Sequence, residues 1–137
     1  MEDPIQVELL QIIRHEKTAQ QYIYLREHEG ERTFPIVIGY PEVFEIERKL
    51  KGNTSDRPFT HDLIGNLIRG LDYHLDRVVI TELRHNTFYA ELVLTHIQDP
   101  GDERRIDSRP SDAIALAVQL RAPIYVSREV LDAVTQN

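Results

Sequence analysis

One short pattern occurs twice in this sequence and constrains the fold more than any other feature. Residues 57–62 and 109–112 each combine an arginine, a proline, a hydroxyl side chain and an aspartate, directly before an apolar run. Proline is favoured in the first turn of a helix, and an acidic residue there interacts favourably with the helix dipole. The two patterns therefore predict helices that cover residues 60–71 and 111–120.

Runs rich in β-branched and aromatic residues predict the strands. Outside the strands, a shorter amphipathic run predicts a further helix over residues 41–50, and a helical turn is expected after residue 126. Residues 98–105 are expected to form a charged loop. The predicted strands cover residues 5–13, 20–26, 33–38, 75–83, 87–95 and 122–126. Strands and helices do not alternate regularly. The sequence therefore predicts an α+β fold with a mixed, largely antiparallel sheet, built from two hairpins or meanders and packed against three to four helices.

Three details of these elements can be tested against a structure. Pro35 lies within the third strand and cannot donate a hydrogen bond to a neighbour, so that strand is expected at an edge or a bulge. The helix over 111–120 is apolar all round and should be the most buried one. The helix over 60–71 is expected to bury a stripe formed by Leu63, Ile64, Leu67, Ile68 and Leu71.

Length and composition limit the classes of protein that are possible. With 137 residues, 41% of them hydrophobic, the chain is expected to form one domain over residues 1–137, with its core at about 5–130. The net charge of −7 gives no general attraction to nucleic acid, so binding would need a local basic patch or a metal ion. Cysteine is absent, the N-terminus is acidic at Glu2 and Asp3, and no apolar stretch approaches a membrane span. We expect a soluble, cytoplasmic protein without a membrane partner.

Five segments in this order resemble the bifunctional nuclease family. They are residues 34–39 with Glu42, then 57–63, 86–90, 107–117 and 122–126. The resemblance implies an α+β fold, self-association at least to a dimer, and the degradation of both DNA and RNA that is reported for some plant members. It supplies no set of catalytic residues, so the candidate site below is inferred from the side chains themselves.

The acidic residues of the two repeated patterns predict a metal-assisted site. Hydrolysis of a phosphodiester needs an activated water and stabilisation of charge on the phosphate, and carboxylate-bound Mg²⁺ or Mn²⁺ supplies both. The predicted metal ligands are Asp62, Asp107 and Asp112. His61 is predicted to act with Asp62 and Asp112 in catalysis, as a general base or a ligand.

The same patterns provide candidate phosphate-binding groups. Arg57 and Arg109 could each hold a phosphate through two parallel hydrogen bonds, with the hydroxyl of Ser111 beside them. Each of these residues also has an ordinary structural explanation, because acids, hydroxyls and their arginine partners commonly cap helices. His61 is the exception, since neither capping nor the apolar stripe requires an imidazole there.

Two functions follow from these observations. The first is a low-specificity nuclease that hydrolyses DNA, RNA or both. The alternative is a non-catalytic, homo-oligomeric binding or scaffold protein, in which the arginine and aspartate side chains form buried ion pairs that fix the helices. In that alternative, removal of Arg57 or Arg109 would cost about 3 to 5 kcal/mol of stability.

Overall fold

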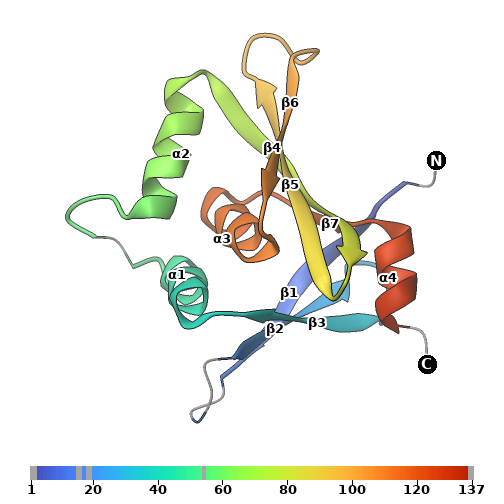
Figure 1. Cartoon of the computed structure of the whole chain (residues 1–137). Helices are drawn as coiled ribbons and strands as arrows, with labels where there is room; N and C mark the ends of the chain where they lie inside the picture. Colours follow the sequence, from blue (N-terminus) through green and yellow to red (C-terminus); the bar gives the residue numbers. More distant parts are fainter. Residues whose placement is uncertain (1–2, 15–16, 18–19, 54, 136–137) are drawn as a thin grey trace.

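The computed structural model describes residues 3–14, 17, 20–53 and 55–135, so the predicted domain range of 1–137 extends beyond them at both ends. The described residues form one seven-stranded sheet in the order β3-β2-β1-β7-β4-β5-β6 (Figure 1). The strands are β1 (Ile5–Ile13), β2 (Gln21–Glu27), β3 (Thr33–Ile38), β4 (Tyr73–Arg84), β5 (Thr87–His96), β6 (Glu103–Ser108) and β7 (Ile124–Val126). The helices are α1 (Tyr40–Leu50), α2 (Thr60–Gly70), α3 (Pro110–Leu120) and α4 (Arg128–Thr135).

The pairing of the strands confirms the predicted α+β fold. Two antiparallel meanders, β1-β2-β3 and β4-β5-β6, are joined by the short strand β7, which lies antiparallel to β1 and parallel to β4. Only this β4–β7 pair is parallel among the described strands, so the sheet is mixed but largely antiparallel. Pro35 pairs with Tyr24 in the edge strand β3, as its missing N–H predicts.

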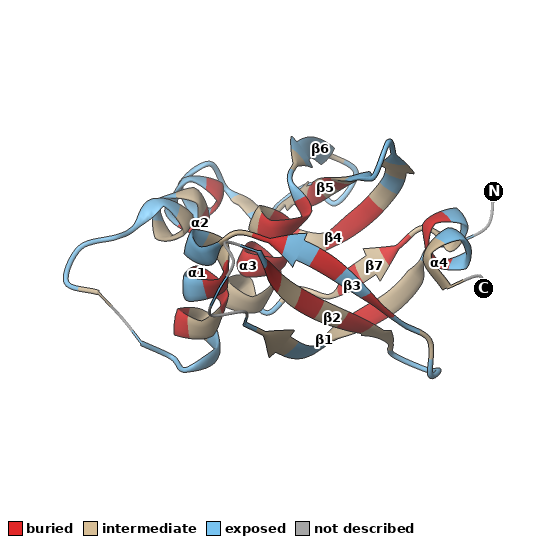
Figure 2. Ribbon diagram, turned by 60° about the horizontal axis from the view of Figure 1, so that its bottom comes forward, coloured by how far each residue is buried: buried red, intermediate tan, exposed pale blue. Residues whose placement is uncertain are grey.

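Helix α3 is the centre of the core. Seven of its eleven residues are buried, and it packs against α1 and the middle strands (Figure 2). Its three buried alanines, Ala113, Ala115 and Ala117, allow the helix backbone to come close to its neighbours. The prediction that this helix is the most buried is confirmed. None of the helices formed by the described residues is both long enough and apolar enough to cross a membrane.

The expectation of a loop at residues 98–105 was partly wrong, because residues 103–108 form the edge strand β6. All but Ser108 are exposed, so the segment has no hydrophobic alternation that would mark it as a strand. Its stability comes instead from backbone pairing with β5 and from ion pairs such as that between Arg105 and Glu91, at 3.1 Å. This strand matters for the candidate site, because it ends with Asp107 and Ser108, which lie directly before the start of α3.

The predicted buried stripe of α2 was also wrong in large part. Ile68 is buried and Ile64 is half-buried, whereas Leu63, Leu67 and Leu71 are 50%, 54% and 67% exposed. Figure 1 shows α2 at the outer edge of the group of helices, and only Gly65 and Ile68 of this helix are buried. At Gly65 an added Cβ would be 2.6 Å from Nε2 of Gln119, so α2 and α3 approach each other closely there. The apolar face of α2 is therefore wider than the part of it that packs against the rest of the protein.

Candidate active site

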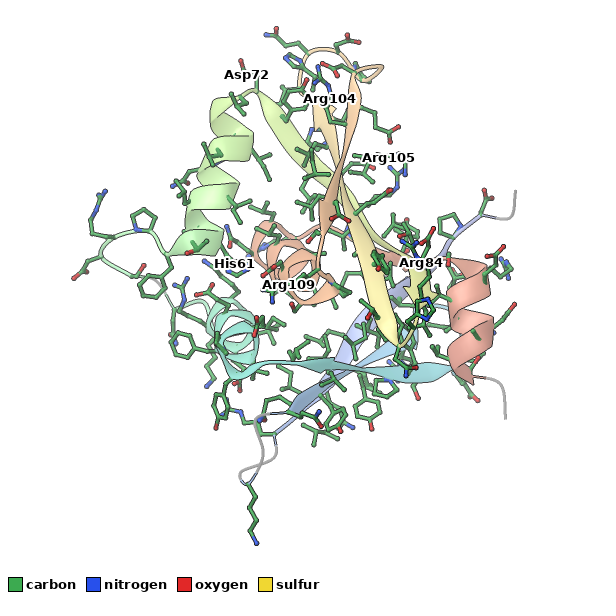
Figure 3. All side chains as sticks on the ribbon, viewed as in Figure 1. His61, Asp72, Arg84, Arg104, Arg105 and Arg109 are labelled. Carbon is green, nitrogen blue, oxygen red and sulfur yellow. The ribbon has the colours of Figure 1, made fainter. Side chains whose placement is uncertain are left out.

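A cleft of about 810 Å³ lies where the first turns of α1, α2 and α3 meet the end of β6. All three first turns contain an acidic residue, and those of α1 and α3 also contain a proline, whereas Pro58 precedes the N-cap residue Phe59 of α2. Figure 3 shows His61 and Arg109 close together in this region, whereas Arg84, Arg104 and Arg105 lie on the β4-β5-β6 meander. The polar lining of the cleft consists of Glu42, Glu45, Thr60, His61, Asp107, Ser108, Arg109 and Asp112.

His61 is held between two carboxylates. Its Nε2 is 3.0 Å from Oδ1 of Asp112, and its Nδ1 is 3.8 Å from Oε2 of Glu45. The first distance is a hydrogen bond and the second is too long for one. Because a carboxylate only accepts, the proton of a neutral imidazole belongs on Nε2, which leaves the lone pair of Nδ1 available. The side chain of His61 is 12% exposed, so the protein fixes the ring while the cleft gives access to it.

Arg109 joins the two acidic residues that flank the cleft. Its Nε donates to Oδ2 of Asp112 at 2.9 Å, and its Nη2 lies 3.1 Å from Oε1 of Glu42. The hydrogen bond with Asp112, followed by the charges of Asp112 and Glu42, raises the pKa of Arg109. The side chain remains 67% exposed, and a guanidinium has five N–H donors. Arg109 therefore keeps donors for a phosphate oxygen while its position is set by two carboxylates.

A buried ion-pair network lies behind His61. Arg48 on α1 is 7% exposed and contacts Oε2 of Glu45 at 3.3 Å and Oδ2 of Asp62 at 3.0 Å. Lys49 also binds Asp62. Acidic and basic side chains thus alternate along one series, which connects the start of α2 to α1. Its members, in order, are Glu42, Arg109, Asp112, His61, Glu45, Arg48, Asp62 and Lys49.

Asp62 caps α2 and does not line the cleft. Its Oδ2 accepts a hydrogen bond from the backbone N–H of Phe59 at 2.9 Å, which is half of a capping box. Partial burial raises the pKa of Asp62, but hydrogen bonds from Lys49, the Phe59 backbone and Arg48 outweigh this effect and lower the pKa to about 2. The carboxylate is therefore committed to the α1–α2 network.

Asp62→Asn is expected to lower the free energy of unfolding by about 2 kcal/mol at pH 7. The folded-state pKa lies below the unfolded value, so this contribution is complete above about pH 4 and disappears as the pH falls through about 2. Urea unfolding at several pH values measures it, with Asp56→Asn in the exposed connector before α2 as a control. A stability difference that is the same at pH 7 and pH 2 would contradict this account.

The structure brings together some of the predicted site residues and separates others. His61, Asp107, Arg109 and Asp112 all line the cleft. Ser111 is buried beside it and lines a neighbouring pocket. Asp62 lies in the network described above, and Arg57 lies exposed in the connector between α1 and α2, outside the cleft.

Two acidic residues of the site were missed by the sequence analysis. Glu42 was named only within the family resemblance and Glu45 was not considered, yet both line the cleft, where Glu42 pairs with Arg109 and Glu45 with Arg48. Their spacing is a signal that could have been used: positions 42, 45 and 48 follow one another at three-residue intervals, which places them on one face of a helix.

The predicted metal ligands do not form a preassembled set. Asp107 and Asp112 line the cleft, whereas the carboxylate of Asp62 binds Lys49 and Arg48. Within the part of the chain that the structure describes, no three His, Asp or Glu side chains are grouped so that they could hold a metal ion. A requirement for Mg²⁺ or Mn²⁺ therefore stays a prediction.

Comparison with known proteins agrees with the resemblance inferred from the motifs. An uncharacterized protein of Mycobacterium tuberculosis is 39% identical over 112 residues, which are 82% of this chain and 65% of that protein. Bifunctional nuclease 2 of rice (Oryza sativa subsp. japonica) is 31% identical over 117 residues, 84% of this chain and 36% of the relative. Bifunctional nuclease 2 of Arabidopsis thaliana is 33% identical over 72 residues, 53% of this chain and 22% of the relative.

The chain therefore spans less than two thirds of the length of each of these relatives. The family model described as the bifunctional nuclease domain matches residues 23–137, a segment that contains every side chain of the cleft. That match covers most of the sequence, and the chain belongs to the bifunctional nuclease domain family.

Proposed function

We propose that this chain hydrolyses phosphodiester bonds of DNA, RNA or both in the cleft between α1, α2 and α3. The observation that carries the proposal is the 3.0 Å hydrogen bond between His61 and Asp112, located in this cleft and beside Arg109. An imidazole that is oriented by a carboxylate and placed beside an exposed guanidinium is a suitable arrangement for general-base attack on a phosphate.

The proposed chemistry assigns one role to each of these side chains. Nδ1 of His61 takes a proton from a water molecule as the water oxygen forms a bond to phosphorus and the bond to the leaving oxygen breaks. Asp112 keeps the ring in the required tautomer and stabilises the imidazolium that forms. The remaining N–H groups of Arg109 bind the phosphate oxygens as their charge increases.

The charge of the cleft supports the predicted dependence on a divalent cation. Four carboxylates, those of Glu42, Glu45, Asp107 and Asp112, line it together with Arg109 and His61. A phosphodiester is itself an anion, so a bound Mg²⁺ or Mn²⁺ would reduce the repulsion between substrate and cleft. We therefore propose that cleavage requires such an ion.

The decisive assay is cleavage of labelled single- and double-stranded DNA and RNA by purified protein, with Mg²⁺, Mn²⁺ or EDTA. Asp112→Asn, purified identically, is expected to cut about 10- to 100-fold more slowly, because only one of the two terminal atoms of an amide can accept, whereas His61 and Arg109 both donate, and a neutral amide does not stabilise the imidazolium. Asp56→Asn, which lies outside the cleft, should match the wild type. Equal cleavage by wild type and Asp112→Asn would indicate a contaminant or another site.

The scaffold alternative has less structural support than the nuclease proposal. It requires buried ion pairs at Arg57 or Arg109, but both residues are exposed. One observation does favour the predicted self-association: Leu63, Leu67 and Leu71 repeat once per turn on the exposed side of α2. Sedimentation equilibrium of the wild type and of Leu67→Glu tests this, since a charge on that face should shift the protein towards the monomer.

A further inference from the structure

A second pocket lies directly beside the cleft and shares two side chains with it. Its volume is about 420 Å³, and Glu42 and Arg109 line both cavities. The other walls come from β3, the hairpin between β4 and β5, and the first residues of α3. Small-molecule sites in proteins typically measure about 300 to 1,000 Å³, so this pocket is large enough for a ligand that also reaches His61.

The walls of this pocket combine apolar surfaces with a few hydrogen-bonding groups. Ile36, Ile38 and Phe88 supply apolar surface, and Ser111, which is 7% exposed, adds a hydroxyl. The side chain of Asn86 comes from the tip of the hairpin. Such a mixture is typical of sites for flat heterocycles, whose faces pack on apolar side chains while their edges form hydrogen bonds.

One acceptor in this pocket lacks a donor. Oε1 of Glu42 is 3.1 Å from Nη2 of Arg109, whereas Oε2 is buried and has no hydrogen-bond partner among the described residues. Oε2 lies against Gly39, where an added Cβ would be 2.7 Å away. A buried carboxylate oxygen without a donor is unfavourable, and the terminal torsion of glutamate rotates easily. Rotation of that torsion turns Oε2 from Gly39 towards the pocket that Glu42 lines, where N–H groups of a ligand would satisfy it.

The charges in the pocket argue for a neutral ligand. Arg109 is already bonded to both Glu42 and Asp112, and a further anion here would lie beside the Glu42 carboxylate. A neutral group with N–H donors avoids that repulsion and supplies what Oε2 lacks. Within a nucleic acid, these properties belong to the bases and not to the phosphates.

Guanine fits these groups better than the other bases. Its Watson–Crick edge presents two adjacent N–H donors, at N1 and N2, next to the acceptor O6. A carboxylate accepts from both donors, and the hydroxyl of Ser111, which lines the same pocket, can donate to O6. Adenine and cytosine place a ring nitrogen acceptor where the carboxylate would lie. We propose that this pocket is a base-binding subsite that prefers guanine, adjacent to the phosphate cleaved at His61.

This inference rests on the proposed function, since it places the base of the substrate beside the phosphate site. Calorimetric titration of the wild-type protein with GMP, IMP, AMP, CMP and UMP in the presence of Mg²⁺ tests it, because a mononucleotide has no phosphodiester bond that could be cleaved. GMP should bind with a dissociation constant at least about tenfold lower than that of AMP. IMP should be intermediate, because inosine lacks the amino group at N2. Equal affinity for GMP and AMP, or no binding of any nucleotide, would overturn the proposal.

Variants test the assignment to Glu42. Glu42→Gln should abolish the preference for GMP over AMP, whereas Glu82→Gln, an exposed glutamate on β4 that pairs with Arg84, should retain it. Ser111→Ala should weaken GMP binding several-fold. A preference for GMP that persists in folded Glu42→Gln contradicts the assignment. If that variant fails to fold, the comparison of GMP, IMP and AMP on the wild type decides the question alone.

Cleavage and binding assays separate this proposal from the proposed function. Nucleic acid that is cut by a protein with equal affinity for all five nucleotides contradicts the guanine subsite and leaves the nuclease proposal intact. A clear preference for GMP in a protein that cuts no nucleic acid supports the subsite and contradicts the nuclease proposal.

Discussion

His61→Gln is expected to lower the rate of nucleic-acid cleavage about 10²- to 10⁴-fold, the contribution typical of a general base. The amide of glutamine can still donate a hydrogen bond to Asp112, so the local structure should be kept. It cannot take a proton from water near neutral pH, so the chemical step should be lost. Single-turnover cleavage measures this step directly, and KM should change much less than kcat.

The matched control for this variant is His74→Gln, which changes an exposed histidine on β4 outside the cleft. It should cleave like the wild type. Circular dichroism and thermal unfolding of both variants check that the fold is unchanged. A folded His61→Gln protein that retains the wild-type rate would remove His61 from the mechanism, whatever the result for Asp112.

Arg48→Ala is expected to destabilise the fold by about 3 to 5 kcal/mol, because it leaves the buried carboxylate of Glu45 without its arginine and removes one of the two cations that bind Asp62. Burial lowers the pKa of Arg48, but hydrogen bonds with Glu45 and Asp62 more than offset this, so its pKa is raised. The guanidinium also lies 4.6 Å from the centre of the Phe59 ring and 3.3 Å from the carbonyl oxygen of Asn53. Urea unfolding at pH 7 gives the free-energy difference.

The control for Arg48 is Arg69→Ala, in which an exposed arginine that bonds to Asn66 is removed. Its effect should be close to zero. If unpaired buried charge causes the loss at Arg48, a triple variant that also carries Glu45→Gln and Asp62→Asn should recover part of it. A loss of less than about 1 kcal/mol in Arg48→Ala would show that the network is no stronger than an exposed ion pair.

The parts of this fold that could be predicted are the elements for which the local sequence and the burial of the side chains favour the same structure. The apolar strands and α3 were located from sequence because their side chains both favour the element and enter the core. Strand β6 was missed because Glu103, Arg104 and Arg105 are exposed, and their strand conformation depends on pairing with β5. The exposed leucines of α2 could not be identified from periodicity, which shows that a helix has an apolar face but not what covers it.

The candidate site was predictable in its residue types but not in its pairings. His61 and Asp112 are 51 positions apart, and their contact depends on how α2 is placed against α3. Asp62 and Asp112 occupy equivalent first-turn positions in the two sequence patterns, yet Asp62 faces Lys49 and Arg48 whereas Asp112 faces the cleft. Which cation approaches each carboxylate is a property of the tertiary structure, and no spacing within the chain shows it.

The weak attachment of α2 has a consequence for how the proposed site responds to heating. The helix buries only Gly65 and Ile68 fully, and otherwise depends on the polar contacts of Asp62 and of Gln119, whose amide donates to the carbonyl oxygen of His61 at 3.1 Å. Local opening of α2 should therefore require less free energy than global unfolding, and its amide hydrogens should exchange before those of α3. Each opening separates the imidazole from Asp112. On heating, catalysis should thus fail at a temperature at which the sheet and α3 are still folded.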